Sequence, residues 1–175
     1  MDGLIHILEK EAIPVSWGSI FIGYQLKIID KKEVSEYAEM YLGRHENCDY
    51  LISELVFDDS DCEDILRKII KKRLNKVPEK NNDLWDFEKR KWRFGLLVQV
   101  KNEKLEVDDL LHRIATIYVR FDYPSDMENF IYYLPPTDGY NPGAHTQDEN
   151  YKRLLELFNS FLEKELINFK KILII

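Results

Sequence analysis

Apolar residues recur along most of this chain at the three- and four-residue spacing of one face of an α-helix. In the first half the stripes are Trp17, Ile20, Phe21 and Tyr24; Val34, Tyr37, Ala38, Tyr41 and Leu42; and Ile65, Leu66, Ile69 and Ile70. In the second half they are Val107, Leu110, Leu111, Ile114, Tyr118 and Phe121; and Tyr151, Leu154, Leu155, Phe158, Leu162, Leu166 and Phe169. This pattern predicts an amphipathic helix at each place.

Signals for helix starts and ends flank several of these stripes. Ser16 is placed to cap the first helix. A capping box pairs a capping side chain with a carboxylate three residues on, and four pairs fit: Asp30 with Glu33, Ser60 with Glu63, Ser125 with Glu128, and Thr146 with Glu149. Gly43 is placed to end a helix in the left-handed conformation. Pro124 stops a helix near Tyr123, and a short helix at 126–133 is expected to follow.

The segment 93–107 fits two structures. Alternating apolar residues around 101–104 permit a β-hairpin: Val98, Val100, Leu105 and Val107. The pair Leu96-Leu97 breaks this alternation, and the residues before it are strong helix formers. We therefore predict a helix from Asp83 to Val100.

The composition supports helices throughout. The 175 residues are 45% apolar and 33% charged, with only seven Gly and six Pro. β-proteins need many tight turns, so the scarcity of turn residues favours helices, and the length suits one domain. We expect an all-α protein of about seven to nine helices over residues 1–175. Sublobes at 1–75 and 83–175, joined by a polar linker at 76–82, are an alternative arrangement.

The formal net charge of −7 argues against nucleic-acid binding, which depends on Lys and Arg contacting phosphates. A local basic patch moderates this argument: Lys68, Lys71, Lys72 and Arg73. We recognise no signal peptide at the start and no run of roughly twenty apolar residues to span a membrane. With only Cys48 and Cys62, we expect reduced thiols and a cytoplasmic location.

A search for reactive groups gives little. The histidines His6, His45, His112 and His145 are far apart in sequence, and no phosphate-binding loop or nucleophile elbow is present. Asp108 and His112 lie one helical turn apart, which suits either a metal site completed by another helix or, as we favour, a surface pair. The thiolate of Cys62 would be disfavoured by its acidic neighbours Asp61 and Glu63. We expect no catalytic residue, metal or cofactor.

Two groups of residues are candidates for binding a partner. The run 58–64 holds five acids: Asp58, Asp59, Asp61, Glu63 and Asp64. Acids at a helix start offset the helix dipole, but five exceed that need and suit a docking surface for a basic protein. Four tyrosines cluster around the proline-bounded helix and its loop: Tyr123, Tyr132, Tyr133 and Tyr140. Tyrosine is favoured at binding hot spots. Core packing is nevertheless the default for most of these rings, and we expect the exposed tyrosine to lie in the loop 135–145, because loops carry recognition more often than helices do.

Several stretches resemble a bacterial family known as domain of unknown function 2247. They are Val15-Ser16-Trp17 with Gly23, Lys91-Trp92-Arg93-Phe94, Ile117 to Pro124, and Phe130 to Pro135. The resemblance covers most of the chain, and Tyr118-x-x-Phe121-x-Tyr123-Pro124 is its most specific part. It implies a helical protein without catalytic residues, and some members are thought to be immunity proteins of polymorphic toxin systems.

These observations together favour a non-catalytic cytoplasmic binding protein, most consistent with an immunity protein that blocks a toxin by direct contact. Its partner would be a protein, such as a basic toxin domain, and neither nucleic acid nor membrane. A helical adaptor with another protein partner is the first alternative, and a metal-dependent enzyme using His112 is the second. The sequence leaves the oligomeric state open.

Overall fold

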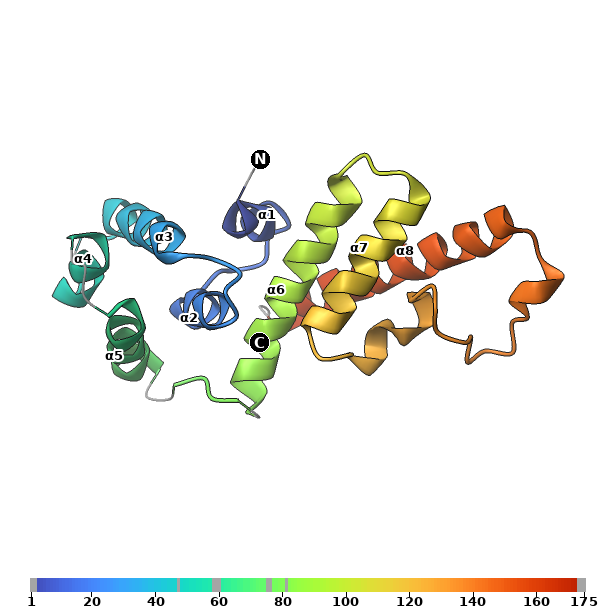
Figure 1. The fold of residues 1–175 in the computed structure, drawn as a ribbon. Helices are drawn as coiled ribbons and strands as arrows, with labels where there is room; N and C mark the ends of the chain where they lie inside the picture. The colour runs from blue at the N-terminus through green and yellow to red at the C-terminus, as the bar shows by residue number, and fades with distance from the viewer. Residues whose placement is uncertain (1–2, 47, 58–60, 75–76, 81, 173–175) are drawn as a thin grey trace. The chain divides into compact units, whose positions relative to one another are not determined.

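A computed structural model describes residues 3–46, 48–57, 61–74, 77–80 and 82–172, and in these ranges the chain is all-α with no strand (Figure 1). The class predicted from the sequence is confirmed. The α-helices are α1 Leu4–Lys10, α2 Trp17–Gln25, α3 Lys31–Arg44, α4 Tyr50–Phe57, α5 Cys62–Leu74, α6 Asp83–Asn102, α7 Val107–Arg120 and α8 Gln147–Ile172. Two 3-10 helices are η1 Ser125–Phe130 and η2 Pro142–Ala144.

The chain forms two compact units. One, the terminal unit, comprises residues 1–13 and 93–175, and the other, the middle unit, comprises 14–92. Helix α6 contributes to both, because Trp92 packs on Gly23 in the middle unit while Gly95 lies against Leu8 in the terminal unit. The described part of the predicted linker, 77–80 and 82, lies within the middle unit. A polar stretch indicates a loop, but the boundary between compact units depends on which helices pack together, and the sequence of the loop does not show this.

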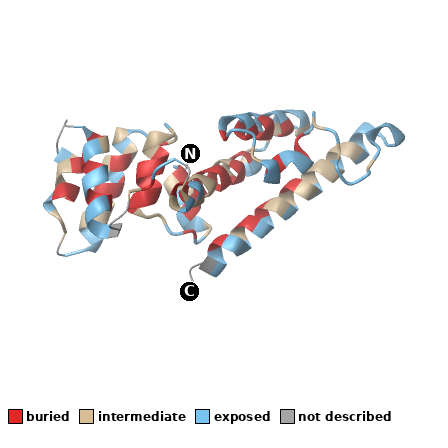
Figure 2. Ribbon diagram, turned by 90° about the horizontal axis from the view of Figure 1, so that it is seen from below, coloured by how far each residue is buried: buried red, intermediate tan, exposed pale blue. Residues whose placement is uncertain are grey.

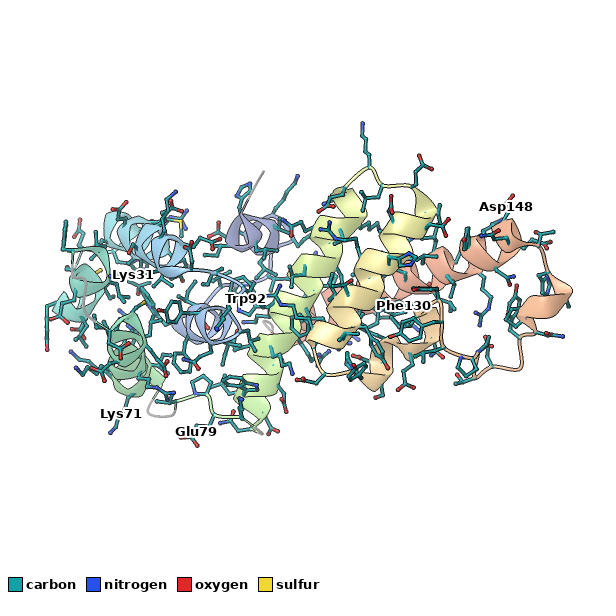
Figure 3. All side chains as sticks on the ribbon, viewed as in Figure 1. Lys31, Lys71, Glu79, Trp92, Phe130 and Asp148 are labelled. Carbon is teal, nitrogen blue, oxygen red and sulfur yellow. The ribbon has the colours of Figure 1, made fainter. Side chains whose placement is uncertain are left out.

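The core of the middle unit is built from α2 to α5 and the start of α6. Its fully buried side chains include Ile20, Phe21, Ile52, Leu66 and Trp92. The indole Nε1 of Trp92 donates a hydrogen bond of 2.7 Å to the carbonyl oxygen of Ser19. Figure 3 labels Trp92 on the part of α6 that belongs to this unit.

In the terminal unit, α8 packs against η1 and against α6. The ring of Phe130 lies 5.6 Å from that of Phe158, and Phe94 lies 5.7 Å from Phe169, centroid to centroid. Figure 2 shows buried positions recurring along the C-terminal half of α8, whereas the half near Gln147 is exposed or half-buried. The predicted helix at Asp83 to Val100 is confirmed, since α6 runs to Asn102 and no hairpin forms in 93–107.

Three of the predicted helix starts have the expected caps. Ser16 caps α2, Asp30 and Glu33 form a capping box at α3, and Thr146 exchanges hydrogen bonds with Glu149 before α8. Ser60 lies outside the described residues. The box at Ser125 is wrong: η1 begins after Pro124 with no side-chain cap, and it is a 3-10 helix ending at Phe130.

Three helices end in left-handed residues that are not glycine. Ala12, Lys27 and Asp122 have φ of 58°, 52° and 64°. Each N–H bonds back to a carbonyl three residues earlier, and the next N–H reaches one five residues earlier, which is the Schellman motif. The prediction for Gly43 is wrong, because α3 continues through it to Arg44 without a positive φ.

Two helices were not predicted as such. α1 spans only two turns, and α4 is an eight-residue helix whose sequence is a short apolar segment without a clear helical stripe. No helix in the described part of the chain is both long enough and apolar enough to cross a membrane. The chain ends in four apolar residues, 172–175, of which 173–175 lie outside the described residues.

Candidate protein-interaction surface

Three of the four predicted tyrosines lie exposed in the terminal unit. Tyr123, Tyr132 and Tyr133 retain 59%, 41% and 49% of their accessible surface. The ring of Tyr132 contacts the ring of Tyr133 edge-on at 5.2 Å and the imidazole of His112 at 4.8 Å. Neighbouring exposed aromatic rings form an apolar patch, and such patches mark interaction sites on protein surfaces. Each ring would bury a large area if a partner covered it.

Tyr123 extends this surface along α7. The Tyr118 ring is buried and meets the Tyr123 ring edge-on at 5.3 Å. Burial, followed by the charge of Glu128 and the phenols of Tyr133 and Tyr123, raises the pKa of Tyr118. Tyr133 therefore lies close enough to influence Tyr118. We call the four rings above the buried Tyr118 the tyrosine surface: His112, Tyr123, Tyr132 and Tyr133.

Backbone geometry fixes the outward position of Tyr123. After α7 ends, Asp122 and Tyr123 both adopt the left-handed conformation, with φ of 64° and 57°. The N–H of Tyr123 donates to the carbonyl of Tyr118 at 3.0 Å. Pro124 follows, with its own φ at −66°. The chain thus reverses away from α7 while the Tyr123 ring stays at its C-terminal end.

Tyr140, the fourth predicted tyrosine, is half-buried and holds the loop before α8. Its ring stacks on His145 at 4.7 Å, and the Arg153 guanidinium lies 4.3 Å from its centroid. Its hydroxyl donates to Asn150 at 2.8 Å. Arg153 also pairs with Asp138 at 2.5 Å and holds the pKa of that carboxyl below its usual range.

A cavity of about 310 Å³ lies between this loop and the first turns of α8. It is lined by Tyr132, Leu134, Pro136, Tyr140, Pro142, Gln147, Asn150, Tyr151, Arg153 and Leu154. We call it the loop pocket. Since Tyr132 also belongs to the tyrosine surface, the pocket and that surface are continuous. Its volume is at the lower end for ligand sites.

The predicted acids lie in the middle unit, apart in the chain from these tyrosines. Asp58 and Asp59 are outside the described residues. Glu63 accepts two hydrogen bonds from Arg67 at 2.8 and 3.0 Å, and Asp64 pairs with Lys68 at 2.6 Å. Asp61 is exposed and accepts from the N–H of Glu63. Bases one turn along α5 therefore offset two of the three described acids.

The two residues considered for metal binding or catalysis, His112 and Cys62, have contacts typical of structural residues. The Nδ1 of His112 lies 2.7 Å from the backbone carbonyl of Asp108. Within the described ranges, no group of three or more His, Cys, Asp or Glu is placed to hold a metal ion. Cys62 is buried, and burial raises its pKa to about 11, with Lys31 opposing and Asp61 adding to the shift. The predicted disfavoured thiolate is thus explained mainly by burial.

A buried polar cluster was missed by the sequence analysis. The carboxylate of Glu88 accepts hydrogen bonds from Ser16 at 3.1 Å and Ser19 at 2.6 Å, beside the start of α2. Lys91 donates to the same carboxylate at 2.9 Å and to the carbonyl of Pro14 at 3.1 Å. Glu88 and Lys91 are only 3% exposed, so the cluster ties α6 to α2 and is closed to a substrate. Two members of the cluster, Ser16 and Lys91, lie in the stretches that resemble the family, and this was the only indication of it in the sequence.

A second buried charge holds the terminal unit. Arg93, 4% exposed, donates two hydrogen bonds to Asp126 at 2.7 and 2.5 Å and lies 3.5 Å from Glu165. This arginine links α6 to η1 and α8, and so fixes the element that leads from Tyr123 to Tyr132. Planar guanidinium groups suit such paired contacts.

The chain matches the model of a family described as "Uncharacterized protein conserved in bacteria (DUF2247)" over residues 5–166. No curated protein matches it significantly, and no solved structure does. The matched range contains both buried clusters and the whole tyrosine surface. With the match covering most of its length, this chain belongs to the bacterial DUF2247 family.

Proposed function

We propose that this protein is a cytoplasmic immunity protein that neutralises a cognate toxin by direct binding, without catalysis. The observation that carries the proposal is the tyrosine surface, where Tyr123, Tyr132 and Tyr133 stay exposed although each could bury a large apolar area. Tyrosine combines that area with a hydroxyl and few rotatable bonds, and it is enriched among residues that dominate binding energy.

The scaffold beneath the surface supports the proposal. Arg93 and its carboxylate partners hold η1 in place, and the turn at Asp122 and Tyr123 sets the direction of the chain. A rigid platform loses little conformational freedom when a partner docks, which favours tight binding. The net charge of −7 would speed encounter with a basic partner.

Co-expression with the toxin encoded by the neighbouring gene tests this function. We expect the wild-type protein to form a complex and to restore growth. The double substitution Tyr132→Ala/Tyr133→Ala should weaken binding by about a hundredfold, since each hot-spot residue contributes roughly 1–2 kcal/mol.

Tyr50→Ala is the matched control, because Tyr50 is 68% exposed on α4 in the other unit. It should bind and protect like the wild type. A complex without growth relief would point to an adaptor role. No complex at all, or equal protection by the double variant, would refute the proposal.

A further inference from the structure

We infer that the loop pocket receives an arginine side chain of the protein partner. This inference rests on the proposed function and adds the chemistry of one anchoring contact. The tyrosine surface supplies area, and the adjoining pocket supplies a specific site for one charged group.

The pocket exists because the apolar face of α8 is incompletely covered at its start. Tyr151, Leu154 and Leu155 continue the stripe that is buried further along at Phe158 and Leu162, yet all three are only half-buried. Figure 2 shows this part of α8 as intermediate and exposed. The Pro- and Gly-rich loop covers it partly and leaves about 310 Å³.

The walls offer aromatic rings to a cation. Tyr132 and Tyr151 line the pocket and offer their rings, whereas Tyr140, which also lines it, already has His145 and Arg153 against its ring. The pocket also contains an intramolecular example of the pairing, since the Arg153 guanidinium lies 4.3 Å from the centroid of the Tyr140 ring. Guanidinium groups stack on tyrosine more readily than ammonium groups, because they are planar and more weakly hydrated.

The charges at the pocket complement a second guanidinium. Arg153 is already paired with Asp138 at 2.5 Å, so the two together are neutral. The carboxylate of Asp108 accepts a hydrogen bond from the hydroxyl of Tyr151, which places an additional negative charge at the wall and raises the pKa of that phenol. Glu149, at the start of α8, lies 3.7 Å from His145, which stacks on Tyr140. Arg153 is thus one guanidinium set against the three carboxylates of Asp138, Asp108 and Glu149, so these four side chains together carry a negative charge.

A titration of the isolated full chain tests the inference without a toxin. The probe is N-acetyl-arginine methylamide, and the control probe is the citrulline analogue, which keeps the shape and lacks the charge. Binding is followed by NMR shifts of tyrosine ring signals, assigned with Tyr132→Phe and Tyr151→Phe. We expect millimolar binding of the arginine probe and about tenfold weaker binding of citrulline.

Two variants at neighbouring positions distinguish the effect of a charge at the pocket wall from the effect of the net charge of the protein. Asp108→Asn should weaken arginine binding about fivefold. Asp109→Asn, with the same charge change in the same exposed first turn of α7, should leave it unchanged. Equal binding of both probes, equal effects of both variants, or no shift with either probe would overturn the inference. Because co-expression measures toxin neutralisation separately, each proposal can fail alone.

Discussion

At the scale of single residues, Gly23 shows how packing fixes an amino acid. A Cβ built at this position would lie 2.5 Å from the indole of Trp92, which is itself fully buried and bonded to Ser19. The ring cannot move aside without losing that bond. A close approach between α2 and α6 therefore requires glycine here.

We expect Gly23→Ala to lower the free energy of unfolding by about 1–3 kcal/mol through overpacking. Gly43→Ala is the control, because a Cβ there meets nothing within 4 Å in a helix. It should raise stability by up to about 1 kcal/mol, since alanine is the better helix former. Urea denaturation followed by circular dichroism measures both, and equal effects would contradict the packing argument.

Cys62 gives a second prediction at this scale. Its pKa is raised from 9.0 to about 11, chiefly by burial, so the thiol stays protonated at neutral pH. Iodoacetamide at pH 8 should alkylate the more exposed Cys48 well before Cys62 in the native protein. Peptide mass spectrometry resolves the two sites, and equal rates would be inconsistent with the burial.

The same shift affects stability with a defined sign. Above pH 9 the unfolded chain releases the thiol proton while the folded protein keeps it, so stability falls between pH 9 and about 11. Cys62→Ala removes this contribution. The difference in unfolding free energy between variant and wild type should therefore change in favour of the variant as the pH rises through that range.

At the scale of elements, three helices end in a left-handed backbone conformation at residues other than glycine. Ala12, Lys27 and Asp122 occupy a left-handed position that glycine adopts at little cost. Ala12 is exposed and follows α1. The Cβ penalty of roughly 1–2 kcal/mol in this conformation is offset by the hydrogen bonds of the motif and by burial of Ile13.

Ala12→Gly should accordingly stabilise the protein by about 0.5–1 kcal/mol after the entropy of glycine in the unfolded state is subtracted. Thermal unfolding measures this as a higher midpoint. Ala144→Gly, at an exposed position in η2 without a positive φ, provides the comparison and should not stabilise. A lower midpoint for Ala12→Gly would show that the left-handed turn is not strained.

These helix ends also explain where sequence analysis succeeded and failed. Starts at Ser16, Asp30 and Thr146 were predictable because a cap depends on side chains a few residues apart. The ends at Ala12 and Lys27 were not, because tertiary packing selects a left-handed turn without glycine. η1 does not follow the capping rule, since Pro124 occupies its N-cap position, and its Asp126 is bound by Arg93 from far away in the chain.

The candidate site was predictable to a similar extent. The sequence favoured core packing for most of the four tyrosines and exposure in the loop 135–145, whereas Tyr123, Tyr132 and Tyr133 are exposed and Tyr140 is half-buried. The internal contacts of Tyr140 depend on Arg153 from α8 and were not visible in the sequence. The Glu88–Lys91 cluster likewise requires α6 to meet α2, which no local pattern specifies.

At the scale of the whole molecule, charge is the property most relevant to a partner. The net charge of −7 gives a long-range attraction to a basic protein that salt screens beyond about 10 Å at 0.1 M. Affinity at short range would depend on the tyrosines instead. Association and dissociation therefore report on different features.

For the proposed toxin partner, we expect the association rate to fall about tenfold or more between roughly 0.02 and 0.5 M salt. The dissociation rate should change much less, whereas Tyr132→Ala should raise it. Stopped-flow or surface-based kinetics separates the two rates. A salt-independent association rate would mean that the acidic surface does not steer the encounter.

The turn at Asp122 and Tyr123 has a wider consequence. Two successive bulky left-handed residues before a proline persist only where the surrounding fold dictates the backbone, so the Cα–Cβ bond of Tyr123 points in a direction that the fold has set. If the proposed partner binds here, selectivity would then arise mainly from the rejection of surfaces that do not fit this turn, because the backbone cannot adapt to them.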